Sequence, residues 1–171
     1  NFPKYVIIFS GTVSATINLL LNSIIILIFM IVNGVEFTPG ILIGVLYVIE
    51  ILLFSMGIAF FLSALFVKFK DVQYIWDILL RGGFYASAIF FPISRIISES
   101  NETVAQILLL SPIGQAIQDV RHFSVSQDMP TLYTVSGSVY VASVPIIFSL
   151  VVFVVGALYF RAKSPYFAEE T

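Results

Sequence analysis

The chain has 171 residues, of which 59% are hydrophobic and only 11% are charged. The net charge of −2, without a basic stripe, argues against nucleic-acid binding. Cysteine is absent, which excludes disulfides and thiolate metal sites. Such an apolar composition would leave a soluble domain with too little polar surface, so we expect the membrane to be the solvent for most of the chain.

Four long, mainly apolar stretches follow one another along the sequence. Each has about 20 residues or more, which lets an α-helix cross a hydrocarbon core of about 30 Å. They cover residues 5–32, 41–67, 72–92 and 135–160. Because lipid offers no hydrogen-bond partner to an open backbone, we predict an all-α membrane protein, a polytopic bundle with four transmembrane helices.

The basic residues predict how these helices are oriented. If the spans alternate in direction, five of the eight basic residues fall on one side and only Arg95 and Arg121 fall on the other. The five are Lys4, Lys68, Lys70, Arg161 and Lys163. The positive-inside rule then places the C-terminus in the cytoplasm and residues 93–134 outside.

The first span carries a face of small and polar residues. Gly11, Ser14, Ala15, Asn18 and Asn22 recur at intervals of three and four, so a helix places them on one side. We interpret this side as a packing face, because small residues let helices approach and Asn side chains can bond across the contact. The alternative is that Asn18 and Asn22 form one wall of a translocation path.

The second span contains Glu50 near mid-membrane. A carboxyl group there is costly in lipid and should face protein or water. Gly57 and Ala64 lie on much the same helical face, which favours a buried structural contact. A proton relay or a substrate contact is the alternative, although no other acid or histidine accompanies Glu50 in the span.

Asp71 directly precedes the third span and is placed to cap its helix N-terminus. Asp77 and Arg81 are four residues apart, so they share a helical face and could form an internal ion pair. The alternative for Arg81 is a place in the path of an anionic substrate. Gly82 and Gly83 follow and would allow close packing or a bend.

The outer segment 93–134 is too apolar for a solvated loop and too interrupted for a span. Thr103–Leu110 is apolar, and Ser111 and Pro112 break the pattern. A short amphipathic helix is then expected as far as Phe123. We predict a re-entrant or interfacial helical hairpin here.

The polar side of that amphipathic helix includes Gln115, Asp119 and His122. We expect its apolar side to pack on the fourth span and these three residues to face water. His122 is the only histidine in the chain, and one histidine makes neither a metal site nor a credible catalytic triad. No phosphate-binding glycine loop or HExxH motif is present, so we expect no enzyme active site, no metal and no cofactor on this chain.

Four segments carry a family resemblance in the same order along the chain. They are Phe2–Lys4, Phe69–Pro92 (FKDVQYIWDILLRGGFYASAIFFP), Leu110–Phe123 (LSPIGQAIQDVRHF) and Tyr159–Glu170 (YFRAKSPYFAEE). They resemble the link into the third helix, the "FRD" start of the fifth helix, the "NP…R" outer element and the "FxR…FAE" ending of one family. That family is the membrane subunit of type-2 ABC exporters, in the branch that exports O-antigen, capsule or teichoic acid.

Three positions depart from the family pattern. Lys70 replaces the usual Arg, Ala88 stands where Pro is frequent, and Ser111 stands where Asn is frequent. These departures bear on the substrate branch more than on the family.

The resemblance implies a single transmembrane domain that contains the last four of six spans. It implies a homodimeric permease in the bacterial cytoplasmic membrane, with two ATP-binding cassette subunits that carry ATP and Mg²⁺. The substrate would be a lipid-linked polysaccharide or polyol-phosphate polymer. Lys68, Lys70 and Asp71 would lie by the ATPase contact.

The remaining candidates fall into two groups. Those for the translocation path or a buried polar contact are Glu50, Asp77, Arg81, Asn18 and Asn22. Those for an outer gate over the exit are Pro112, Gln115, Asp119 and His122. Two other interpretations stay open: a drug or small-lipid exporter of the same superfamily, and a structural membrane subunit with no transport role.

Overall fold

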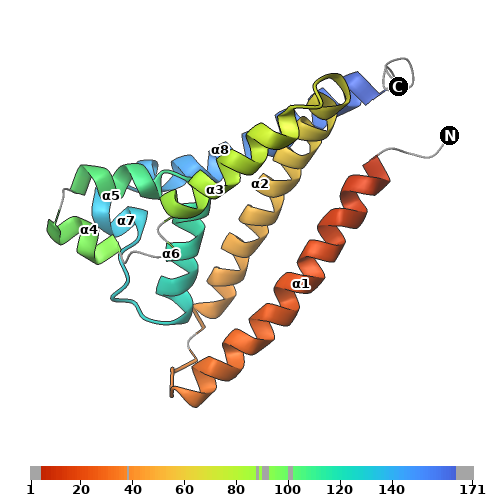
Figure 1. The fold of residues 1–171 in the computed structure, drawn as a ribbon. Helices are drawn as coiled ribbons and strands as arrows, with labels where there is room; N and C mark the ends of the chain where they lie inside the picture. The colour runs from red at the N-terminus through yellow and green to blue at the C-terminus, as the bar shows by residue number, and fades with distance from the viewer. Residues whose placement is uncertain (1–4, 38, 88, 90–92, 100–101, 165–171) are drawn as a thin grey trace.

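The computed structural model describes residues 5–37, 39–87, 89, 93–99 and 102–164 (Figure 1). Helices are the only regular secondary structure in these ranges, which confirms the predicted all-α class. The helices are α1 (Tyr5–Val32), α2 (Ile41–Lys68), α3 (Val72–Ala86), α4 (Ile93–Glu99), α5 (Glu102–Leu109), α6 (Pro112–Ser124), α7 (Leu132–Ser136) and α8 (Val139–Lys163).

Helices α1, α2 and α8 are long and apolar enough to cross a membrane. They have 28, 28 and 25 residues, so at a rise of 1.5 Å per residue each exceeds a hydrocarbon core of about 30 Å. Their bounds lie within a few residues of the predicted spans 5–32, 41–67 and 135–160. The chain is therefore a multi-pass membrane protein.

The predicted span 72–92 forms a shorter helix than expected. Helix α3 has 15 residues, about 22 Å of helix, and ends at Ala86 beside Ser87. Positions 88 and 90–92 of the prediction lie outside the described residues. By length and composition, the described chain therefore contains three candidate spans and not four.

The long helices run back and forth between two ends of the molecule (Figure 1). The start of α1, the turn between α2 and α3 and the end of α8 lie together at one end. The short helices α4–α7 gather at the other end of α8. This is the alternation that was assumed when the basic residues were assigned to the two sides.

Helices α2 and α8 form the main interior contact, and two glycines allow it. A Cβ atom on Gly57 would lie 2.6 Å from the backbone N and Cα of Phe153, and one on Gly156 would meet the carbonyl oxygen of Gly57. The two backbones therefore touch directly. Next to this contact Phe60, Ala64 and Phe160 form a buried apolar cluster.

Helix α1 lies apart from the rest of the chain over most of its length (Figure 1), and Met30 is its one buried residue. Its predicted packing face is uncovered: nothing lies within 4 Å of a Cβ placed on Gly11. Asn22 is exposed and donates to the Asn18 carbonyl oxygen of its own helix at 2.8 Å. Within the described residues no helix packs on this face, so the packing interpretation requires another chain.

The outer segment folds into helices, as predicted. Helix α5 ends at Leu109 and α6 begins at Pro112, so the chain breaks where Ser111 and Pro112 indicated. Ile93, Ala105, Leu109 and Leu132 form its buried apolar core. The segment is thus a small helical unit held by its own side chains and by contacts of α6 with α2 and α8.

Candidate functional site

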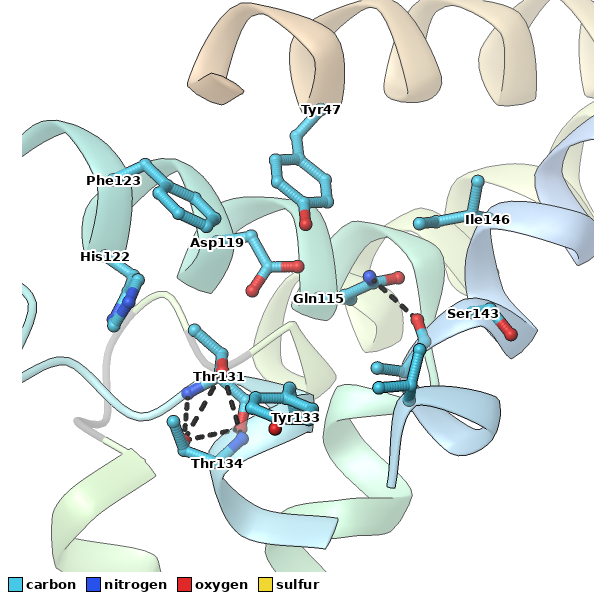
Figure 2. Close-up of a pocket in the computed structure, with 12 residues that line it drawn as sticks. Tyr47, Gln115, Asp119, His122, Phe123, Thr131, Tyr133, Thr134, Ser143 and Ile146 are labelled. Atoms are coloured by element: carbon cyan, nitrogen blue, oxygen red, sulfur yellow. Dashed lines mark hydrogen bonds between the residues drawn. The ribbon is translucent and has the colours of Figure 1, made fainter. Parts of the chain in front are cut away.

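A cavity of about 460 Å³ lies between α2, α6, α7 and α8 (Figure 2). The four elements place aromatic, polar and aliphatic side chains around it. The lining residues are Tyr47, Gln115, Asp119, His122, Phe123, Thr131, Tyr133, Thr134, Val139, Ala142, Ser143 and Ile146. Three of the predicted outer-gate residues therefore meet in one site.

The polar side of α6 is buried, which differs from the prediction for it. Gln115, Gln118 and Asp119 are only 1%, 2% and 4% exposed, whereas the apolar Ile113 is 37% exposed. The expectation that Gln115 and Asp119 face water was therefore wrong. The physical reason is that lipid, unlike water, solvates apolar side chains, so a helix at the membrane turns its polar side toward protein.

Asp119 is the charged group at the inner wall of the cavity. Burial raises the pKa of this carboxyl above its ordinary value. Hydrogen bonds with the side chains of Gln115 and Tyr47 act in the other direction and favour the ionised form, and so does the positive charge of His122 whenever its imidazole is protonated. In Figure 2 the Tyr47 hydroxyl points from α2 toward this carboxylate.

His122 is partly buried, whereas we expected from the sequence a side chain that faces water. Its Nδ1 atom lies 2.8 Å from the Met129 carbonyl oxygen. A carbonyl oxygen can only accept, so Nδ1 carries the proton of this bond. In the neutral ring Nε2 is then a hydrogen-bond acceptor.

Other polar groups of the lining donate their hydrogens within the protein. Gln115 Nε2 donates to the Ala142 carbonyl oxygen at 3.2 Å, which fixes the orientation of the amide. Thr134 Oγ1 donates to the Thr131 carbonyl oxygen at 2.9 Å, and Ser143 Oγ donates to that of Tyr140 at 2.9 Å. These side chains keep acceptor capacity but have little donor capacity to spare.

A second polar contact lies deeper, between α2 and α8. Ser149 Oγ is 3.1 Å from Glu50 Oε1 and 2.9 Å from the Pro145 carbonyl oxygen, and both side chains are buried. Gly57 and Ala64 on the same face are buried too, so Glu50 lies in a buried structural contact between the two helices. Glu50 Oε2 is buried without a hydrogen-bond partner among the described residues.

The candidate residues of the α2–α3 turn lie far from the cavity, at the end of the molecule that holds the start of α1 and the end of α8 (Figure 1). Lys68, Lys70 and Asp71 are exposed there. Asp71 occupies the N-cap position of α3, but its side chain makes no cap hydrogen bond, so the predicted capping contact is absent. Asp77 and Arg81 are both exposed on α3, so they lie on the surface of the chain and not in its interior, where the ion pair was predicted.

Sequence reasoning missed the contributions of other elements to the cavity. Tyr47 comes from α2, where it did not stand out in an apolar span, and Tyr133 comes from α7, at the end of the outer segment. One available signal was the spacing of Tyr47 and Glu50, because residues three apart share a helical face. Ser149 was equally hidden, since a single Ser in an apolar span has no distinctive pattern.

Comparison with known proteins adds no relative. No protein-family model, curated protein or solved structure matches this chain.

Proposed function

We propose that the chain is the permease subunit of an ATP-driven type-2 ABC exporter. In this proposal it moves a lipid-linked polysaccharide or polyol-phosphate polymer across the bacterial cytoplasmic membrane. Two copies of the chain work with two ATP-binding cassette subunits, which hold ATP and Mg²⁺. The specific family and substrate rest on the sequence resemblance described above.

The observation that best supports this proposal is the division of the molecule into two different ends. One end carries the exposed basic turn with Lys68 and Lys70, and the other carries the helical unit α4–α7. A permease driven from the cytoplasm needs a polar contact for its motor on one side and a cover over the exit on the other. The positive-inside rule assigns the basic end to the cytoplasm.

Co-purification tests the proposed motor contact. The full-length protein is extracted from its native membrane in mild detergent, and ATPase activity is measured in the wild type and in the K70E/D71K variant. We expect the wild-type complex to hydrolyse ATP and the variant to lose the partner or the coupling. Charge reversal at Glu36, in the connection at the opposite end, is the matched control and should leave the activity unchanged. A wild-type complex without an ATPase would contradict the proposal and favour a structural subunit.

Cysteine labelling tests the orientation independently. Because the chain has no cysteine, Lys68→Cys and Asp128→Cys each introduce a unique thiol. We expect an impermeant reagent added outside intact cells to label position 128 and not position 68. Labelling at position 68 alone would reverse the topology.

A further inference from the structure

The cavity between α2, α6, α7 and α8 has an open mouth and a polar inner wall. Tyr133 and Val139 are 54% and 66% exposed, so they mark the mouth. Asp119 and Gln115 form the inner wall, where their side chains are almost completely buried. A volume of about 460 Å³ is within the range of small-molecule sites.

The polar chemistry of the inner wall is dominated by acceptors. Asp119 provides carboxylate oxygens, and His122 provides Nε2 in its neutral form, since its Nδ1 is bonded to the Met129 carbonyl oxygen. The hydroxyl hydrogens of Thr134 and Ser143 are donated to backbone carbonyl oxygens. A ligand that fits this wall should therefore carry several hydrogen-bond donors and require few donors from the protein.

Aromatic rings complete the cavity. Tyr47 and Phe123 are stacked with ring centroids 6.0 Å apart and an interplanar angle of 14°, and Tyr133 adds a third ring at the mouth. The faces of such rings attract cations as well as apolar groups. Rings beside a buried carboxylate are a suitable environment for a cation with an apolar body.

We propose that this cavity binds a small organic ammonium ion. The ammonium group, which has three donors and no acceptor, lies at Asp119 and His122, and the apolar part of the ligand lies against the rings of Tyr47, Phe123 and Tyr133. The site stands on the geometry of the cavity and does not depend on the export function.

Other ligand classes fit the cavity less well. A hard divalent cation needs six or more oxygen ligands, but the described residues contain no group of three or more His, Cys, Asp or Glu side chains that could hold a metal. A neutral sugar needs several donors for its own oxygens. The Thr134 and Ser143 hydroxyls already donate to backbone carbonyl oxygens, which leaves the Tyr133 hydroxyl at the mouth as a donor but few others in the lining. An anion would be repelled by Asp119.

Calorimetric titration of the purified full chain in detergent tests the proposal with three probes. Benzylammonium carries the proposed charge, benzyl alcohol has the same ring without the charge, and methyl glucoside is a neutral polyol. We expect benzylammonium to bind at least tenfold more tightly than benzyl alcohol, and methyl glucoside to show no binding. Equal binding of benzylammonium and benzyl alcohol, or preferential binding of methyl glucoside, would overturn the proposal.

Variants locate the site. Asp119→Asn should weaken benzylammonium binding at least tenfold, whereas Asp128→Asn, at an exposed carboxylate of the same outer segment, should not. If Asp119→Asn does not fold, Ser143→Lys serves as the second test, because its tethered ammonium would occupy the cavity and exclude the probe. Wild-type affinity in a folded Asp119→Asn or Ser143→Lys protein would refute the assignment.

Discussion

The contact between α2 and α8 leaves no room for a side chain at Gly57, so Gly57→Ala should destabilise the protein. The new Cβ would lie 2.6 Å from the N and Cα atoms of Phe153 and 2.7 Å from the carbonyl carbon of Val152. Non-bonded carbon atoms prefer separations of about 3.5–4.0 Å. Because all three neighbours are backbone atoms, the helices must separate by about 1 Å.

The expected magnitude follows from two opposing effects. Forcing an extra carbon into a close-packed interior costs about 1–3 kcal/mol, and the unyielding backbone of Phe153 favours the upper part of that range. Replacing Gly by Ala inside a helix returns about 0.5–1 kcal/mol. The free energy of unfolding should therefore fall by about 1–2 kcal/mol, which corresponds to a loss of about 2–8 °C in Tm for a protein of this size.

The assay is thermal or denaturant unfolding of the purified protein in one detergent, followed by circular dichroism. Gly82→Ala is the matched control, since it makes the same change inside α3 where nothing lies within 4 Å of the new Cβ. The control should be as stable as the wild type or slightly more stable. If Gly57→Ala were also as stable as the control, the two backbones could not be in the contact described here.

Two further predictions concern buried polar groups. Ser149→Ala should lower the free energy of unfolding by about 1–3 kcal/mol, because the Glu50 carboxyl loses its hydrogen-bond donor. In a double-mutant cycle, the combined variant with Glu50→Leu should recover part of that loss. Purely additive losses would argue against the contact. Because the folded-state pKa of Asp119 is raised above 3.8, the stability that its protonated form contributes should be fully present in acid and lost as the pH rises through the raised pKa. Unfolding measured at a series of pH values should show this decline in the wild type and in Asp128→Asn but a smaller one in Asp119→Asn, and identical profiles would contradict it.

The bounds of the long helices could be predicted from the sequence because one physical requirement determines them. An uninterrupted apolar run must satisfy its backbone internally, so α1, α2 and α8 begin and end close to where the apolar runs do. The same reasoning failed for α3. Asp77 and Arg81 interrupt its apolar pattern, and composition alone did not indicate that its helix ends at Ala86.

The candidate site was predictable only within one helix. Gln115, Asp119 and His122 are four and three residues apart, so their meeting follows from helical geometry. Their direction was predicted wrongly, because the rule that polar faces point outward assumes water as the solvent. The opposite wall, with Tyr47 and Tyr133, depends on contacts between distant segments, which no local pattern in the sequence reports.

The buried polar side of α6 has a consequence for any opening of the outer segment. Gln115, Gln118 and Asp119 would lose their protein surroundings if α6 swung into lipid, and each unpaired polar group would then cost several kcal/mol. Helices α4 and α5, by contrast, are held mainly through apolar side chains such as Ile93, Ala105 and Leu109, which lipid solvates as well as protein does. The movement that costs the least free energy is therefore a sliding of α4 and α5 over a stationary α6. The helix with the buried polar residues would then stay in place as a fixed wall while its apolar neighbours move.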